Sequence, residues 1–397
     1  MKSKNILFGF LFALIIVSCS KKEEPFVPAT LVSSSQQVSR AAGDLQTFIG
    51  ASGINLPTAA ITYGTDLYTI TYKTIYQGKP ITASGLVILP QTNSSVGMIC
   101  FNHGTIAAHS EAPSAQPLNS TEWIFYSALA SPGFIAVIPD FIGFGSSASV
   151  LHPYYVEDAT ATPVTDAMKA ARELAIQKNK SFNGKLFIAG YSQGGYVTMA
   201  THKAIEATGL PNFNLIASFP ASGGYDVKGM QNYFWGLNTY DQPFFLAYVA
   251  MSYKTYYNWQ QPLTDVFQTQ YASVIPGLFD GTKSGDQINA ALNDTIPKLL
   301  SPDILANINT GSQYQYIVNA FTENSLLDWY PKIKMYMYHG DADITVPYQN
   351  SVSTYNKLIA NGASPSVLTF TTLPGATHAT GVVPYIQDFI PILLSLK

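Results

Sequence analysis

The stretch LFIAGYSQGGY, residues 186–196, places one serine, Ser192, among three glycines. The residues before Gly190 are apolar and strand-like, whereas the apolar residues after the glycines recur at the spacing of one helix face. The segment 190–194 therefore fits the pattern G-x-S-x-G at a strand-to-helix junction, where the serine hydroxyl is exposed on a sharp turn. Side chains at Gly190 and Gly194 would collide with the neighbouring strand and helix. We therefore expect these glycines to form the turn around a nucleophilic Ser192.

Apolar strand-like runs and helical stretches alternate on both sides of this junction. The alternation begins with a hairpin, whose turn is predicted at Gly78–Pro80. Such a pattern favours an α/β protein with a mostly parallel sheet that is covered by helices on both faces. The predicted strands are 67–76, 81–90, 96–102, 134–140, 185–190, 215–221, 333–340 and 367–375, and the predicted helices are 118–131, 160–178, 193–208, 348–361 and 383–396.

Residues 226–328 interrupt the alternation, because they contain many aromatic residues and short helices but no clear buried strand. We expect a helical cap here, with some aromatic side chains lining a substrate cleft and most of them packed in an ordinary core. The predicted organisation is a signal peptide (1–18), a tether (19–40), a first part of the core (41–225), the cap (226–328) and a second part of the core (329–397).

Composition and charge narrow the class of protein. Of the 397 residues 47% are apolar and only 11% are charged, compared with roughly 25% charged residues in an average soluble protein. Such a surface suits a protein outside the cytoplasm. The net charge of −3 gives no electrostatic footprint for nucleic acid. The two cysteines, Cys19 and Cys100, cannot form a disulfide framework.

The first 19 residues have the organisation of an export signal. Lys2 and Lys4 precede an apolar run over residues 6–17, which is shorter than the roughly 20 residues that span a bilayer. The ending IIVSC resembles a bacterial lipoprotein signal, in which cleavage exposes Cys19 for acylation, and the following SKKEEP resembles the export tag of surface lipoproteins in Bacteroidetes-type bacteria. An ordinary cleaved signal is the alternative. We expect an extracytoplasmic protein anchored through Cys19 to the outer membrane, with cell-surface exposure as one arrangement.

A nucleophilic serine needs a base, and the base needs a carboxylate that orients it. At serine sites of this kind the partners follow later strands in the order serine, acid, histidine. The seventh predicted strand ends in YHGDADITVP, which contains Asp341 and Asp343, and the eighth ends in LPGATHATG, which contains His378. We prefer Asp343 as the acid, since GDADITVP fits the pattern G-x-x-D-x-x-V-P around the usual acid of such sites. Asp341 is expected in a turn or a helix cap, and a solvated or capping role stays open for both.

A tetrahedral intermediate also needs hydrogen-bond donors for its oxyanion. The stretch MICFNHGT ends a predicted strand, and Gly104 lets the chain turn so that the Thr105 amide points at the substrate. The second donor is the amide of Gln193 at the start of a helix. His103 is expected to brace this loop. We expect no metal and no cofactor, because the histidines lack the spacing of a zinc protease, and a structural or exposed position for His109, His152, His202 and His339.

The motifs HGT, PDFIGFGSS…HPYY, AGYSQGG, NSLLDWYPK and HGDADITVP…GATH resemble, in this order, the secretory lipases of the lipase-A-like group of α/β-hydrolases. The resemblance covers roughly residues 65–397. It implies an α/β-hydrolase fold with an eight-stranded sheet, a helical cap between strands six and seven, and hydrolysis of carboxylic esters through an acyl-enzyme. By position it implies Ser192 as nucleophile, Asp343 as acid, His378 as base, and the amides of Thr105 and Gln193 as the oxyanion hole. Many secreted members are braced by disulfides, and none is possible in this chain beyond a pairing of Cys19 with Cys100.

Three functions fit these observations. The first is an esterase or lipase that cleaves a small-molecule, lipid or polysaccharide ester, such as an acylglycerol or a feruloyl ester. The second is a prolyl-peptidase-like peptide hydrolase, although no large module precedes residue 67. The third is a surface binding lipoprotein on a silent hydrolase scaffold. The complete set of triad candidates in order favours the esterase, while its chain-length preference, the mobility of the cap and the oligomeric state stay open.

Overall fold

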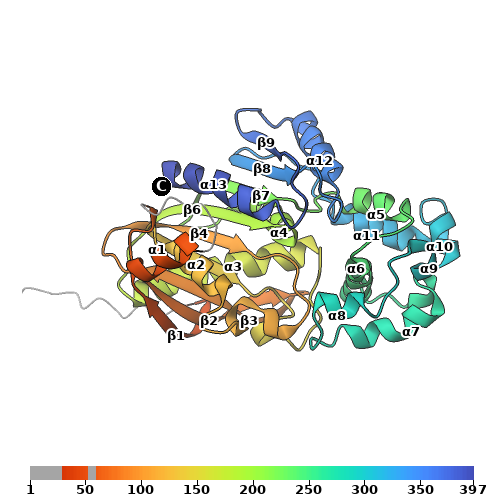
Figure 1. Ribbon diagram of the computed structural model, residues 1–397, viewed down its shortest axis with the longest axis horizontal. Helices are drawn as coiled ribbons and strands as arrows, with labels where there is room; N and C mark the ends of the chain where they lie inside the picture. Colours follow the sequence, from red (N-terminus) through yellow and green to blue (C-terminus); the bar gives the residue numbers. More distant parts are fainter. Residues whose placement is uncertain (1–28, 52–59) are drawn as a thin grey trace, which may run out of the picture.

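The computed structural model describes residues 29–51 and 60–397, and its centre is a sheet of nine strands (Figure 1). The strand order is β1-β2-β3-β5-β4-β6-β7-β8-β9. Pairing is antiparallel from β1 to β5 and parallel from β5 to β9. The strands are β1 (Leu31–Arg40), β2 (Thr65–Tyr76), β3 (Lys79–Pro90), β4 (Val96–Asn102), β5 (Phe134–Pro139), β6 (Phe182–Tyr191), β7 (Asn214–Ala221), β8 (Lys334–Gly340) and β9 (Leu368–Leu373).

Helices cover both faces of this sheet, as continuous apolar strands require. Along β4, successive residues alternate between the two cores: Met98 and Cys100 belong to one cluster and Ile99 and Phe101 to the other. The first cluster is covered by α3 (Glu157–Gln177), α4 (Gln193–Thr208) and α12 (Tyr348–Asn361), and the second by α1 (Ala42–Ala51), α2 (Thr121–Ala130) and α13 (Val382–Leu396). The predicted α/β architecture is therefore confirmed.

The hairpin of β2 and β3 turns one residue earlier than predicted. Its strands pair without a shift up to Tyr76 and Lys79, so the turn consists of Gln77 and Gly78. Both turn residues have positive φ, 50° and 72°, as the tight two-residue turns that match strand twist require. The expected turn at Gly78–Pro80 is therefore wrong, and Pro80 lies inside β3.

The sheet has nine strands instead of the expected eight, because the segment assigned to a tether ends in strand β1. This strand is mostly polar and pairs with β2 at the edge of the sheet, where one side needs no apolar cover. Its start is fixed by the buried carboxylate of Glu173 on α3, which accepts the backbone N–H groups of Ala29, Thr30 and Leu31 at 2.6–3.1 Å. The predicted signal peptide and Cys19 lie outside the described residues.

Between β7 and β8 the chain leaves the sheet and forms a helical body beside it, coloured green to light blue in Figure 1. These helices fall within the segment 226–328 that the sequence assigns to the cap, and we keep that name for them. They are α5 (Val227–Trp235), α6 (Pro243–Tyr256), α7 (Thr269–Leu278), α8 (Gly285–Asn289), α9 (Ile296–Leu299), α10 (Pro302–Asn307) and α11 (Gln315–Glu323). In the described part of the chain, no helix is both long and apolar enough to cross a bilayer.

We predict that Glu173→Gln lowers the free energy of unfolding by about 1.5–3 kcal/mol, because it removes the charge that accepts three backbone N–H groups at the start of β1. Chemical denaturation measures this loss, and limited proteolysis should cut the chain before β1 more readily. The exposed Glu122→Gln on α2 is the matched control. Equal stability of the two variants would contradict the anchoring role of Glu173.

Candidate active site

Ser192 lies in the turn between β6 and α4, where the backbone adopts φ 60° and ψ −126°. Positive φ is unfavourable for a residue with a side chain and persists only where the surroundings hold it. Here the Ser192 amide donates to Ala221 O of the adjacent strand β7 at 2.9 Å. The side chain is thereby held at the carboxyl edge of the parallel strands, where open α/β sheets bind their ligands.

The glycines of the motif allow three segments of backbone to meet at this turn. A Cβ atom on Gly194 would lie 2.0 Å from the carbonyl oxygen of Asn102 at the end of β4. A Cβ atom on Gly190 would lie 2.3 Å from the carbonyl oxygen of Gly194 itself. The neighbouring strand and helix therefore exclude side chains at both positions, as the sequence predicts.

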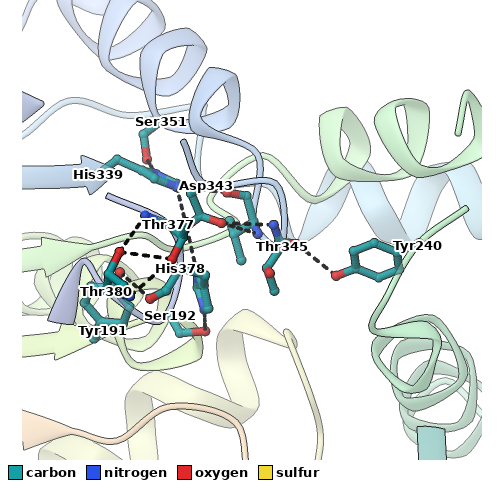
Figure 2. A network of polar contacts seen from close by, with 12 residues as sticks. Tyr191, Ser192, Tyr240, His339, Asp343, Thr345, Ser351, Thr377, His378 and Thr380 are labelled. Carbon is teal, nitrogen blue, oxygen red and sulfur yellow. Dashed lines mark hydrogen bonds and ion pairs between the residues drawn. The ribbon is translucent and has the colours of Figure 1, made fainter. Parts of the chain in front are cut away.

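The structure brings the three predicted triad residues together (Figure 2). His378 Nε2 lies 2.8 Å from Ser192 Oγ, and His378 Nδ1 lies 2.7 Å from Asp343 Oδ2. Asp343 follows β8 and His378 follows β9, so both partners come from the same edge of the sheet as Ser192. Asp341, the other candidate, is exposed and accepts the Gly375 amide at 2.6 Å. The Asp343 carboxylate is therefore the one in position to orient His378.

The Asp343 carboxylate is buried but well supplied with hydrogen bonds. Its Oδ1 accepts the amides of Thr345 and Val346, both at 3.0 Å, and its Oδ2 accepts from His378 and His339. Burial alone would raise the pKa of Asp343, but the hydrogen bonds from the two histidines outweigh it and lower the pKa. The loop that supplies the amides is itself held by the cap, because Tyr240 donates its hydroxyl to Thr345 O at 2.8 Å.

His339 is a second histidine in contact with the Asp343 carboxylate, and the sequence did not predict this contact. It is fully buried at the end of β8, with Nε2 3.1 Å from Asp343 Oδ2 and 2.9 Å from Val346 O. Both neighbours of Nε2 are acceptors, so this nitrogen carries the proton and donates. On the other side of the ring, Nδ1 pairs with Ser351 Oγ at 2.6 Å. The available signal was its position four residues before the acid, at a strand end.

Of the two residues predicted to supply the oxyanion donors, Gln193 directly follows Ser192 and Thr105 lies in the loop after β4. The loop after β4 runs against the nucleophile, since a Cβ atom on Gly104 would lie 3.8 Å from Ser192 Cβ. Within residues 29–51 and 60–397 neither the Thr105 amide nor the Gln193 amide has a hydrogen-bond acceptor. The Thr105 hydroxyl pairs with Tyr154 OH at 2.8 Å. His103 stacks on Phe141 and contacts the loop carbonyl of Gly104, in line with the expected brace.

The side chain of Gln193 is fixed by a buried histidine, His152. Because His152 Nδ1 lies 2.6 Å from the carbonyl oxygen of Ile142, that nitrogen donates and Nε2 is left as an acceptor. Gln193 Nε2 donates to it at 2.6 Å. Burial lowers the pKa of His152 to about 3, which keeps it neutral and able to accept. Ser252 of the cap helix α6 in turn donates to His152 O at 3.0 Å.

A pocket of about 990 Å³, its part open to solvent included, extends from Ser192 into the cap. Apolar and aromatic side chains dominate its wall. The core side of the wall consists of Tyr154, Tyr155, Ser192, Gly224, Thr345 and Val346. The cap side comes mainly from α5, α6, the loop after α6 and α11. Its residues include Val227, Met230, Gln231, Phe234, Trp235, Tyr240, Phe245, Leu246, Val249, Tyr253, Trp259, Ile317 and Phe321.

Several solved structures that are similar to this chain are named as hydrolases, esterases or lipases. A Legionella pneumophila protein named as a hydrolase matches with TM-score 0.83 and 24% identity over 92% of this chain and 98% of that chain. The rice cell wall degrading esterase LipA from Xanthomonas oryzae matches with TM-score 0.78 and 24% identity over 93% and 98%. Candida antarctica lipase A matches with TM-score 0.64 and 16% identity over 93% and 83%. No protein-family model and no curated protein sequence matches. Together with the strand order, these likenesses show that the chain has the α/β-hydrolase fold.

We predict that His339→Leu raises the pKa of Asp343, because one of the donors that oppose burial is lost. A higher pKa leaves the carboxyl protonated over more of the acidic range, so the acid limb of kcat/KM should move to higher pH. At neutral pH kcat should fall roughly ten- to a hundredfold, the effect of losing a hydrogen bond to a charged group, about 1.5–3 kcal/mol. Hydrolysis of 4-nitrophenyl butyrate across pH gives both values.

His339→Gln is the matched comparison, since its side-chain amide keeps an N–H donor and should recover part of the acid limb. A purely structural role for His339 predicts a lower free energy of unfolding with an unchanged pH profile. That result would show that His339 does not position the Asp343 carboxylate.

Proposed function

We propose that this protein is a serine hydrolase of carboxylic esters that works through an acyl-enzyme. The observation that carries the proposal is the continuous chain of hydrogen bonds from Ser192 Oγ through His378 to Asp343 Oδ2. This arrangement is what a serine needs to act as a nucleophile, since the histidine takes its proton and the carboxylate holds the histidine in the required tautomer. Esterases and lipases among the similar structures support the same class of reaction.

In the proposed reaction Ser192 Oγ attacks the ester carbonyl carbon while its proton passes to His378 Nε2. The negative charge that develops on the carbonyl oxygen is stabilised by the unpaired amides of Thr105 and Gln193. When the tetrahedral intermediate collapses, His378 gives the proton to the leaving alkoxide, and the alcohol departs. Water, deprotonated by His378, then attacks the acyl-enzyme by the same route and releases the acid and free Ser192.

The position of His378 indicates which part of the ester enters the pocket. The departing alcohol must lie against His378 Nε2 to receive its proton, and His378 does not line the pocket, whereas Ser192 and Tyr154 do. The side chain of His378 is also 19% exposed, so the alcohol has access to solvent on that side. The acyl part therefore occupies the pocket, and its apolar wall favours a sizeable apolar acyl group.

The first test is hydrolysis of 4-nitrophenyl acetate, butyrate and palmitate by the soluble chain that begins after Cys19. Wild type should cleave butyrate better than acetate by roughly fourfold per methylene, because each buried methylene contributes about 0.8 kcal/mol. Ser192→Ala should lower kcat/KM at least about 10³-fold. The exposed Ser395→Ala on α13 is the matched control and should behave as wild type.

Three outcomes would contradict the ester hydrolase. Equal rates for wild type and Ser192→Ala would assign the activity to another group. No cleavage of any ester by a folded sample, together with cleavage of proline peptide anilides, would favour the peptide hydrolase. If neither substrate is cleaved and a fluorophosphonate does not label Ser192, the surface binding lipoprotein would be the remaining function of the three.

We also propose that the protein is acylated at Cys19 and held at the outer membrane by this anchor, on the evidence of the sequence motif alone. Bacteria that express the full chain should incorporate labelled palmitate into it and retain it in the membrane fraction. Cys19→Ser should lose the label, whereas Cys100→Ser, which changes the buried cysteine, should keep it. Label on both variants, or on neither the variants nor the wild type, would refute acylation at Cys19.

A further inference from the structure

The wall of the pocket contains two buried N–H donors that no acceptor satisfies. They are Nε2 of Gln231 and Nε1 of Trp235, and within the described residues neither has a hydrogen-bond partner. Both residues line the pocket, and both come from α5, one helical turn apart, so they share one face of the helix. Resting on the ester hydrolase proposed above, we propose that these donors select an acyl group that carries a neutral oxygen acceptor within an otherwise apolar body.

The orientation of the Gln231 amide follows from its neighbour Lys228. Gln231 is 3% exposed, and its Oε1 accepts from Lys228 Nζ. An ammonium group only donates, so the oxygen of the amide must face Lys228. Lys228 lies on the outer side of α5 and does not line the pocket. The amide therefore turns its oxygen outward and leaves its nitrogen for the pocket side.

The other buried polar groups along this wall already have partners in the protein. Tyr154 pairs with Thr105, Tyr240 donates to Thr345 O, and Tyr253 donates to Tyr155 O at 2.7 Å. Lys254 Nζ donates to the carbonyl oxygens of Trp259 and Gln261 at 2.7 and 2.6 Å, so two of its three N–H groups have partners within the cap. Among the described residues that line this pocket, Gln231 Nε2 and Trp235 Nε1 are thus the buried side-chain polar atoms without a hydrogen-bond partner.

A buried donor without a partner costs about 1–3 kcal/mol. A purely hydrocarbon acyl chain leaves that cost in place in the complex, whereas an ether, hydroxyl or methoxy oxygen at the right depth removes it. Both donors are uncharged, so a neutral oxygen suits them better than a carboxylate, whose desolvation in this apolar pocket is expensive. The substrate class is therefore an ester of an oxygen-bearing fatty or aryl acid.

The test is an oxygen scan of one substrate. A series of 4-nitrophenyl esters is made from one unbranched medium-chain acid in which a single methylene is replaced by an ether oxygen, position by position. One position, or two adjacent positions, should raise kcat/KM about tenfold over the all-methylene ester, equivalent to about 1.4 kcal/mol. The other positions should lower it, because they place an oxygen against apolar side chains.

Variants then assign the effect to α5. Gln231→Met keeps the size of the side chain but removes its donor, and Trp235→Phe removes the indole N–H; each should weaken or abolish the oxygen preference while the all-methylene ester is still cleaved. Gln261→Met, an exposed amide on the rim of the same pocket, should keep the preference. If one α5 variant fails to fold, the other carries the assignment.

Three results are distinguishable. Preference for the all-methylene ester over every oxygen-containing ester in the wild type would overturn the inference and leave the ester hydrolase intact. An oxygen preference that survives in both α5 variants would place the acceptor elsewhere and equally overturn it. Failure of the wild type to cleave any ester would instead overturn the proposed function on which the inference rests.

Discussion

Close contact between three segments of backbone is the constraint on which the site depends. The turn at Ser192 lies between the ends of β4 and β7, and side chains at Gly190 and Gly194 would overlap carbonyl oxygens of this contact. The cost of the positive φ at Ser192 is met by the packing of α4 against the sheet. Because β4, β6, β7, β8 and β9 are parallel, the loops that follow them lie at the same edge of the sheet. Residues distant in the sequence therefore meet there.

Hydrogen bonds, rather than a paired cation, keep the buried acid ionised. Asp343 accepts two backbone amides and two imidazole N–H groups. Burial raises its pKa, but the interactions with the two histidines outweigh burial and lower it. Beside the expected oxyanion donor Gln193 the partner is also uncharged, because buried, neutral His152 accepts the side-chain N–H of Gln193. Because these partners are uncharged, His378 is the side chain that gains and loses a charge in the proposed reaction. The changes of charge in the proposed reaction are therefore confined to the atoms that react and to His378.

The parts of the fold that follow from local pattern could be predicted, and the parts that depend on tertiary contact could not. Continuous apolar runs identified the parallel strands, and the order of Ser192, Asp343 and His378 pointed to residues that the fold brings together. Strand β1 escaped notice because an edge strand needs no apolar alternation, and the interactions that fix it, its pairing with β2 and its contact with Glu173, are tertiary. His339 lies four residues before Asp343, but this spacing alone does not place the two side chains in contact, so the contact became visible only in three dimensions.

The hydrogen bond from Tyr240 to Thr345 O joins the cap to the loop that supplies two amides to Asp343. This contact couples the two segments. If it stabilises the cap in its present position, it stabilises the ordered loop beside Asp343 by the same free energy. A cap that swings away to admit a substrate would therefore loosen the carboxylate, and a cap that returns would tighten it. Any movement of the cap at this contact would therefore be coupled to the order of the loop that holds Asp343.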